Sequence, residues 1–549
     1  MSHRSRGCLR CRQRRVKCDR ARPSCMRCVT RNERCVGYRD ENDLLFENET
    51  EKIVKRNQAA VQLADTASLT WASTPSSASR SSASSHRGRT RSLSPSRYTT
   101  SPSTTSSHYL DSEALPWTAE RSAGPGLKDC GIATDVAVAH FFDRYVLYPC
   151  SDASTPGFLE HLPCLFKEVN VEGRQALRWA VKATALADLS RLEESTPEAA
   201  GAAFDCYGEA LTALRESLSE KGKVPDDYDL MTVVVLDIFE TLFMPDYVDD
   251  QSHAQGMAHI LRLRGQGQFH DARSWGLFRL AHHRVQKQQL AKKMPPLPEA
   301  RAWLDTFGGS DGMGRLERDG QSISALCHRA RQLLTRISDR DAPSNAEILQ
   351  LVLEMQQLDK EATLWRQTPE WSFSTVAKSV DLRLPQELYR VLPDTLQLHR
   401  DIWMAYEWNY HRAARMILHG QLLQCLGETV SSMEAAQPSS GYLDELSLAL
   451  ELRMQMEVSV STVQILADEV LGTVPQAFGD VDANGRPAEP DRLPGCRAIG
   501  AYLLLWPIKI LKGKEAATSE AQKHAGSVIF ARIRDCTGMK KNLGELSII

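Results

Sequence analysis

Six cysteines near the N-terminus form two triplets with the same internal spacing. They follow the pattern C-x2-C-x6-C-x6-C-x2-C-x6-C and are Cys8, Cys11, Cys18, Cys25, Cys28 and Cys35. Cysteines at short, regular intervals are typical zinc ligands, and a structural zinc ion takes four ligands in a tetrahedron. Six sulfurs can fill two such sites only if two of them bridge both ions. Because every cysteine has an equivalent in the other triplet, the spacing favours a bridged pair of Zn2+ ions.

Two other interpretations of the cysteines remain open. Disulfide scaffolds belong mainly to secreted proteins, but the N-terminal residues MSHRSRG are polar and basic and contain no apolar signal segment. The other eight cysteines are scattered singly along the chain, as in a reducing compartment. A mononuclear site made by Cys8, Cys11, Cys25 and Cys28 would leave Cys18 and Cys35 without a role. Both interpretations are therefore disfavoured.

The segment between the first and last of these cysteines cannot form a hydrophobic core. Its aliphatic side chains are only Leu9, Val16, Ala21, Met26 and Val29. Segments shorter than roughly 40 residues usually need a metal or a disulfide to fold. Structural zinc supplies on the order of 10–16 kcal/mol in zinc-finger peptides. We therefore expect this segment to be unfolded without metal.

Positive charge is concentrated around the cysteines. Residues 1–40 contain thirteen Lys and Arg against three acidic residues, whereas the whole chain has a net charge of −2. Arg12, Arg14, Arg15 and Lys17 lie between the second and third cysteines. Arg and Lys bind guanine O6 and N7 in the major groove, and other basic residues contact phosphates. The pattern predicts binding to double-stranded DNA; a nuclear import signal or a solvated surface is the alternative interpretation.

The run GCLRCRQRRVKCDRARPSCMRCVTRNERC resembles the DNA-binding domain of the fungal zinc binuclear cluster (Zn2Cys6) transcription factors, over residues 7–38. The resemblance implies that Cys8 and Cys25 bridge two zinc ions. It places Arg15 where the family has its base-reading lysine, with Arg14 and Lys17 at flanking DNA-contacting positions. It also implies a nuclear, sequence-specific regulator of RNA polymerase II transcription that reads CGG triplets.

The partners expected from the resemblance are double-stranded DNA with CGG triplets and transcriptional coregulators. A homodimer is left open, because the expected coiled-coil seam in residues 39–69 is too polar. The alternative function is that of a zinc-stabilised adaptor for RNA or protein. RNA recognition normally uses aromatic side chains for stacking, and the N-terminal segment has only Tyr38.

The rest of the chain divides by composition. Residues 39–69 are a polar linker with room for a short helix at 50–64, and residues 70–127 are a Ser/Thr/Pro-rich linker that we expect to be disordered. Residues 131–549 have helical periodicity and predict a large all-α domain, so that the fold class is mainly α. Segments such as FFDRYVLYP and FLEHLPCLF are similar to the fungal-specific transcription factor domain, which implies a regulatory role. One continuous helical segment is predicted over 385–427.

The sequence offers little support for an enzyme or a membrane protein. No H-E-x-x-H or G-x-S-x-G motif is present, so we predict no catalytic or cofactor-binding residues. His282 and His283 are adjacent, and on a helix we expect them to point to different faces, which suits packing better than metal binding. No run reaches the roughly 18–20 apolar residues of a membrane span.

Overall fold

The structure is a computed structural model of the 549-residue chain. In the helical region it describes residues 134–148, 157–168, 174–190, 197–244, 252–306, 312–338, 344–364, 369–435, 442–488 and 497–539. In the N-terminal segment it describes residues 8, 10, 11, 14, 16, 18, 19, 21, 25–31 and 35. The predicted linkers at 39–69 and 70–127, with the helix at 50–64, lie outside these residues.

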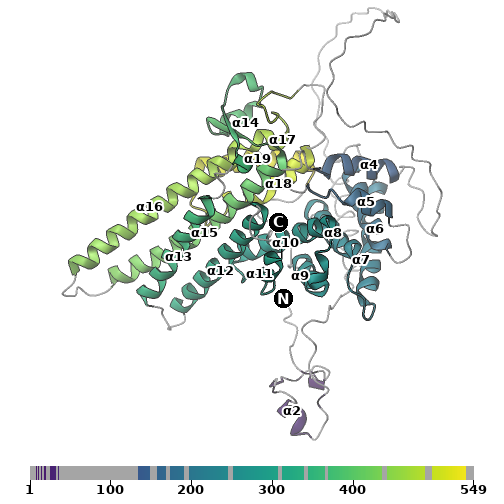
Figure 1. The fold of residues 1–549 in the computed structure, drawn as a ribbon, viewed down its shortest axis with the longest axis horizontal. Helices are drawn as coiled ribbons and strands as arrows, with labels where there is room; N and C mark the ends of the chain where they lie inside the picture. The colour runs from purple at the N-terminus through teal and green to yellow at the C-terminus, as the bar shows by residue number, and fades with distance from the viewer. Residues whose placement is uncertain are drawn as a thin grey trace, which may run out of the picture. The chain divides into compact units, whose positions relative to one another are not determined.

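Helices dominate the described residues, which confirms the mainly α fold class (Figure 1). The N-terminal segment contains α2 (Met26–Val29). The helices of the helical region are α4 (Thr134–Tyr145), α5 (Leu162–Glu168), α6 (Gln175–Leu189), α7 (Pro197–Ser219), α8 (Asp227–Phe243), α9 (Ser252–Arg264), α10 (Ala272–Lys292), α11 (Ala300–Asp305), α12 (Gly312–Ser338), α13 (Asn345–Leu364), α14 (Gln386–Val391), α15 (Ile402–Ala435), α16 (Tyr442–Gly472), α17 (Val474–Phe478), α18 (Arg497–Leu511) and α19 (Glu520–Thr537). Short 3-10 turns are η1 (Gly265–Gln268), η3 (Pro369–Trp371) and η4 (Val380–Leu382).

Helix α8 forms the apolar centre of the first half of the helical region. It contains three consecutive valines at 233–235, which alone would also suit a strand. A capping box starts the helix instead: the Asp226 side chain accepts hydrogen bonds from the backbone N–H groups of Tyr228 and Asp229, and the Asp229 side chain accepts from the Asp226 N–H. Nearly the whole helix is then buried, with α6 and α7 packed on it.

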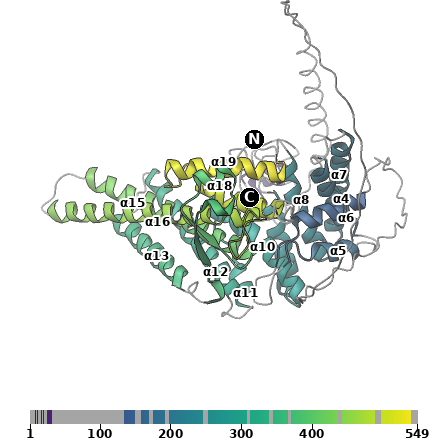
Figure 2. The ribbon, with the colours of Figure 1, turned by 90° about the horizontal axis from the view of Figure 1, so that it is seen from above.

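Four long helices lie side by side in the second half of the helical region. Helix α15 contacts α12, α13, α16 and α18, and both views show α12, α13, α15 and α16 running alongside one another (Figures 1 and 2). Their shared core includes Tyr410, Leu418 and Leu422 from α15 and Leu351 from α13. Burial of such side chains contributes about 1.5–3 kcal/mol each. The core therefore holds α15 as the central helix of this group.

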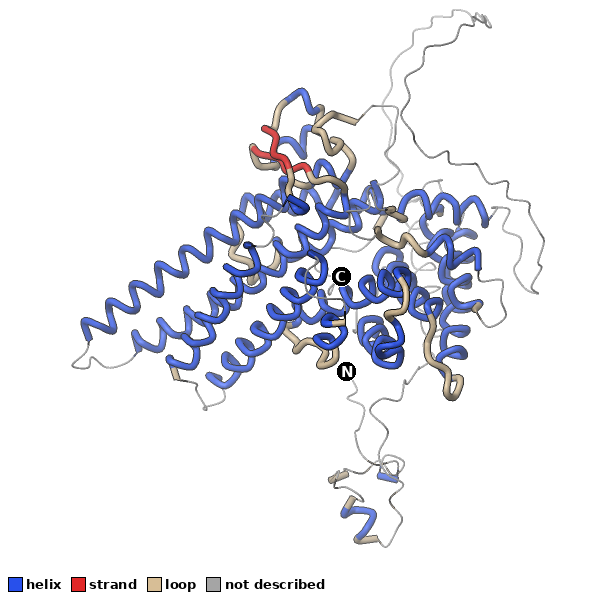
Figure 3. The backbone as a smooth tube through the Cα atoms, viewed as in Figure 1, coloured by secondary structure: helices blue, strands red, loops and turns tan. Residues whose placement is uncertain are grey.

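A small β-hairpin interrupts the helices (Figure 3). The prediction of one continuous helix over 385–427 is therefore wrong in its first part. Helix α14 ends at Val391 and is followed by Pro393, which disfavours a helical conformation for the residue before it. Strand β2 (Thr395–Leu398) then pairs antiparallel with β1 (Ser374–Ala377). Helix α15 starts after Asp401, whose carboxylate accepts the N–H of Met404 at 2.6 Å.

The expectation that His282 and His283 face different ways is also wrong. Both are buried on α10, and their Nδ1 atoms lie 2.8 and 3.1 Å from the two carboxylate oxygens of Glu317 on α12. Burial raises the pKa of Glu317, but the hydrogen bonds from the two histidines outweigh it and hold that pKa well below its usual range. Burial lowers the pKa of His283 to about 4. Both rings therefore contact one carboxylate, where they join α10 to α12.

None of the helices that the structure describes combines the length and the apolar composition needed to cross a bilayer.

Candidate metal centre and DNA interface

The six N-terminal cysteines lie together. Cys8, Cys11, Cys25 and Cys28 are almost completely buried, while Cys18 and Cys35 pack against them and are partly exposed. The Sγ atom of Cys8 lies 3.6 Å from that of Cys25 and 3.7 Å from that of Cys28. A disulfide bond is only about 2.05 Å long, so these sulfurs are not bonded to each other. Four sulfurs placed about 2.3 Å from one zinc ion lie about 3.8 Å apart, which fits the distances found.

The sulfurs form two overlapping groups of four. One group contains Cys8, Cys11, Cys18 and Cys25, and the other contains Cys8, Cys25, Cys28 and Cys35. Within each group all the sulfurs lie within 4.8 Å of one another. Cys8 and Cys25 are the members that the groups share. The donor set therefore fits two tetrahedral Zn2+ ions better than one.

Short backbone turns bring the cysteines of each triplet together. In the second triplet, Cys25 is extended and α2 follows it at once, so that the N–H of Cys28 donates to the carbonyl of Cys25 at 3.0 Å. Residues three apart on a helical turn lie on one face, which places both sulfurs on the same side. In the first triplet, the N–H of Cys11 lies 3.5 Å from the Sγ of Cys8. Such N–H···S contacts orient the thiolates that bind metal.

Asp19 connects the two triplets, a role that the sequence analysis missed. It follows Cys18, and its carboxylate accepts the backbone N–H groups of Met26 at 3.0 Å and Arg27 at 3.5 Å. The hydrogen bond from Met26 is the main reason that the pKa of Asp19 is lowered. No local sequence signal marks this role, because the residue directly ahead of α2 is Cys25 and Asp19 lies further along the chain toward the N-terminus.

Burial also explains why zinc binding is coupled to protons. It raises the pKa of the Cys8 thiol to about 12 and raises the pKa of Cys11 as well. Free thiols are mostly protonated at neutral pH, and burial favours the protonated form further, whereas zinc binds thiolates. Loading the cluster must therefore release protons, and zinc affinity should weaken as the pH falls.

The surface of the cluster carries basic and apolar side chains. Arg10, Arg27 and Arg31 are exposed, and Met26 and Val29 are 59% and 53% exposed. The segment thus buries cysteines in place of the usual aliphatic core.

The structure places one of the four predicted DNA-contacting residues. Arg14 lies in a turn after the first two cysteines, where its N–H donates to the carbonyl of Arg10 at 3.1 Å. Arg12, Arg15 and Lys17 lie outside the described residues.

Comparison with known proteins identifies the N-terminal segment. Residues 6–44 match the model of the fungal Zn(2)-Cys(6) binuclear cluster domain. A stretch of 38 residues is 47% identical to White-opaque regulator 2 of Candida albicans, covering 7% of this chain and 8% of that protein. A stretch of 32 residues is 53% identical to Transcriptional regulatory protein moc3 of Schizosaccharomyces pombe, covering 6% of each chain.

These matches span less than a tenth of either relative's length, and no solved structure matches the chain. The family match is confined to the cysteine-rich segment, so the resemblance of residues 131–549 to the fungal-specific transcription factor domain stays a prediction. The expected two zinc ions are confirmed by the family match together with the two four-sulfur groups. Residues 6–44 of this chain are therefore a fungal Zn(2)-Cys(6) binuclear cluster domain, homologous to the corresponding segments of fungal transcription regulators.

Proposed function

We propose that this protein is a sequence-specific DNA-binding transcription factor that acts on RNA polymerase II promoters in the nucleus. The observation that carries the proposal is the pair of four-sulfur groups within a strongly basic segment. A metal cluster of this size has too little apolar surface for a core of its own, and its charge suits a polyanion. DNA binding through phosphate contacts follows from that charge.

We assign the six cysteines to two zinc ions with shared ligands. Cys8 and Cys25 bridge the ions, because each belongs to both groups of sulfurs. Cys11 and Cys18 complete one tetrahedron, and Cys28 and Cys35 complete the other. Zinc would supply no chemistry here beyond holding the two triplets in a fixed geometry.

We assign base recognition to the basic residues after the second cysteine. Arg15 reads guanine in a CGG triplet through the major groove, and Arg12, Arg14 and Lys17 contact the DNA beside it. Arginine at position 15 suits this role, because its planar guanidinium can donate two parallel hydrogen bonds to O6 and N7 of one guanine. The exposed Arg10, on the turn between Cys8 and Arg14, is placed to bind phosphate.

The remaining parts take the roles that their composition suggests. We assign residues 7–38 to DNA binding, residues 39–69 and 70–127 to a linker, and residues 131–549 to a regulatory domain that recruits transcriptional coregulators. The proposal holds for a monomer and for a homodimer.

A substitution of the base-reading residue tests the proposal. Arg15→Ala should weaken binding to a CGG duplex by about 1–3 kcal/mol and relax the preference for CGG over an altered triplet. Arg31→Ala is the matched control, since Arg31 is exposed at the end of α2, outside the base-reading run. It should weaken binding to every duplex by a similar, smaller amount. Fluorescence anisotropy titrations with labelled CGG, altered-triplet and random duplexes measure both effects.

Two results would contradict parts of this proposal. If Arg15→Ala weakened binding equally on all duplexes, Arg15 would be a phosphate contact and base recognition would lie elsewhere. If the protein bound single-stranded RNA more tightly than the CGG duplex at the same salt concentration, it would be an RNA-binding adaptor instead.

A further inference from the structure

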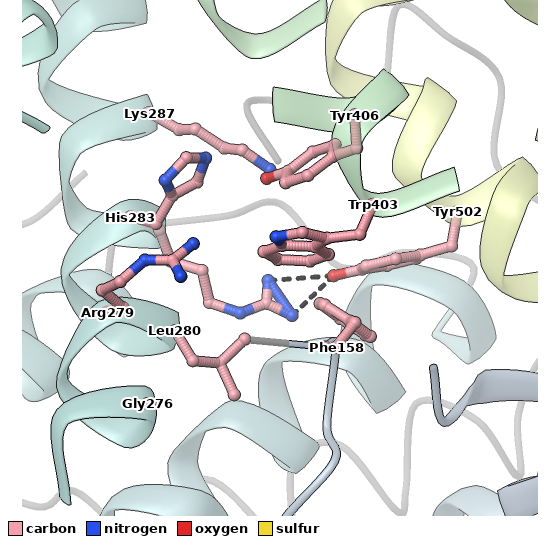
Figure 4. Close-up of a pocket in the computed structure, with 11 residues that line it drawn as sticks. Phe158, Gly276, Arg279, Leu280, His283, Lys287, Trp403, Tyr406 and Tyr502 are labelled. Atoms are coloured by element: carbon pink, nitrogen blue, oxygen red, sulfur yellow. Dashed lines mark hydrogen bonds between the residues drawn. The ribbon is translucent and has the colours of Figure 1, made fainter. Parts of the chain in front are cut away.

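A small cavity in the helical region is lined by cationic side chains (Figure 4). It lies between α10, α15, α18 and the segment around Phe158. Helix α10 contributes Arg279, Arg284 and Lys287, which are only 3%, 8% and 5% exposed. Burying a charged group is costly unless another charge or several hydrogen bonds stabilise it. Each of these groups therefore requires a partner when it is charged.

Carboxylates neutralise two of the three cations. Arg279 donates through Nη2 to Glu407 on α15 at 2.9 Å, and Nη1 of Arg284 lies 3.0 Å from the carboxylate of Asp237 on α8. Among the described residues, no carboxylate oxygen lies within 4.0 Å of the Lys287 Nζ atom. When Lys287 is protonated, its positive charge is thus left without a carboxylate in contact with it.

Aromatic rings face the cations from the opposite wall. The Nζ of Lys287 lies 4.8 Å from the centre of the Tyr406 ring and 5.6 Å from that of Trp506. The Arg279 guanidinium lies 5.7 Å from the centre of the Trp403 ring. A ring attracts a cation through its quadrupole but carries no net charge. These contacts stabilise Lys287 without neutralising it.

Arg279 also has buried hydrogen-bond donors that contact no acceptor among the described residues. Its Nε and Nη1 atoms are buried, and neither has a hydrogen-bond partner among the described residues. Buried donors are rarely left unpaired in proteins. In Figure 4 the side chains of Arg279 and Lys287 extend from α10 toward Trp403 and Tyr406. Unpaired donors and an uncompensated positive charge therefore line the same cavity.

We propose that this cavity binds a small monocarboxylate anion, held by the Lys287 ammonium and the unpaired N–H groups of Arg279. A monoanion matches the single uncompensated charge, and a carboxylate matches the planar guanidinium. The cavity encloses about 20 Å³, and a single water molecule needs roughly 10–15 Å³. Only the carboxylate group of a ligand therefore fits in this space, and the rest of the molecule lies toward the open side of the cavity. The inference is independent of the DNA-binding function.

The pKa of Lys287 is consistent with a carboxylate ligand. Burial and, to a smaller extent, the neighbouring Arg284 lower its pKa to about 7, against the opposing effect of Glu407 and Asp237. A bound carboxylate favours the charged ammonium. Binding should therefore be tighter at about pH 6 than at about pH 8.5, since the lysine is protonated at the lower pH.

Titration of the full-length protein with sodium acetate tests the site. Isothermal titration calorimetry should show saturable binding of acetate at an ionic strength matched with sodium chloride, and no binding of acetamide, its neutral isostere. Lys287→Met keeps the length of the side chain and should weaken acetate binding by at least about tenfold. Lys182→Met is the matched control, because Lys182 also lies over a ring, that of Trp179, but on α6 and outside the cavity. It should leave acetate binding unchanged.

Three outcomes would overturn the proposal: no saturable acetate binding, equal binding of acetate and acetamide, or the same acetate affinity in Lys287→Met as in the wild type. The first would mean that the cavity holds only water. If Lys287→Met does not fold, as judged by its helical circular dichroism, the wild-type pH dependence decides. An acetate affinity that is equal at about pH 6 and about pH 8.5 would then rule out Lys287 as the cation that binds the anion.

Discussion

Cys8 and Cys25 differ from the other four cluster cysteines in the number of four-sulfur groups to which they belong. Each belongs to both four-sulfur groups, whereas Cys11 and Cys18 belong to one group and Cys28 and Cys35 to the other. Replacing Cys8 or Cys25 should therefore affect both zinc ions, whereas replacing any of the other four cysteines should affect one ion directly. Single substitutions can distinguish a shared ligand from an unshared one.

Cys8→Ser should reduce the zinc content from two ions to none, because both tetrahedra lose a ligand and thiolate is a much better zinc ligand than a hydroxyl group. Cys18→Ser is the matched comparison and should retain one ion, bound by Cys8, Cys25, Cys28 and Cys35. Native mass spectrometry of the protein, with zinc supplied during expression, counts the ions. One tightly bound ion in Cys8→Ser, or none in Cys18→Ser, would contradict the shared-ligand assignment.

At the scale of elements, the helical region depends on close approach between short and long helices. A Cβ atom at Gly500 on α18 would lie 1.7 Å from the carbonyl oxygen of Ala477 on α17. No side chain fits at that distance, so the contact between α17 and α18 requires glycine at this position. The glycines of other helices are not equivalent: at Gly256 on α9 a Cβ atom would meet nothing within 4 Å.

Gly500→Ala should therefore destabilise the helical region by about 3 kcal/mol or more, because the backbones of α17 and α18 must separate. Gly256→Ala is the control and should stabilise it by up to about 1 kcal/mol through helix propensity. Urea unfolding followed by circular dichroism measures both changes. Wild-type stability of Gly500→Ala would show that α18 does not pack against α17 as closely as the structure has it.

At the scale of the whole molecule, two kinds of interaction stabilise different parts of the chain. The cluster encloses cysteines and leaves Met26 and Val29 exposed, so metal coordination must stabilise it. The helical region buries extensive aliphatic and aromatic surface, as in the core around α15. The charge also differs, because the acidic residues lie almost entirely after residue 40 and the N-terminal segment is strongly basic.

Chelation should separate these parts. Removing zinc with EDTA should abolish binding to CGG duplex DNA, while the helical circular dichroism signal and the thermal midpoint of the helical region stay close to those of the untreated protein. Adding zinc back should restore DNA binding, which excludes irreversible damage. If the helical signal were lost in proportion to the zinc removed, the metal would also stabilise the helical region, and packing alone would not account for its stability.

Several features of the site and the fold could be predicted from the sequence. The cysteine spacing was sufficient for the pair of zinc ions, since the ligands come from one short segment and their number limits the coordination. Most helices could be predicted as well, because helical periodicity and caps are local properties. The prediction of one helix over 385–427 failed because Pro393 and strand β2 interrupt the segment. That strand pairs with β1, which lies about twenty positions earlier, so a local pattern does not show it.

Taken alone, the amino-acid sequence determined that the N-terminal segment binds metal and that the rest is mainly helical. Only the tertiary structure decided that His282 and His283 share Glu317 and that Asp19 holds the start of α2. It also decided that Lys287 lies in a cavity where no carboxylate of the described residues contacts it. The physical reason is distance along the chain. Coordination within a short segment and helical hydrogen bonds join near neighbours, whereas contacts such as Arg279–Glu407 join residues 128 positions apart.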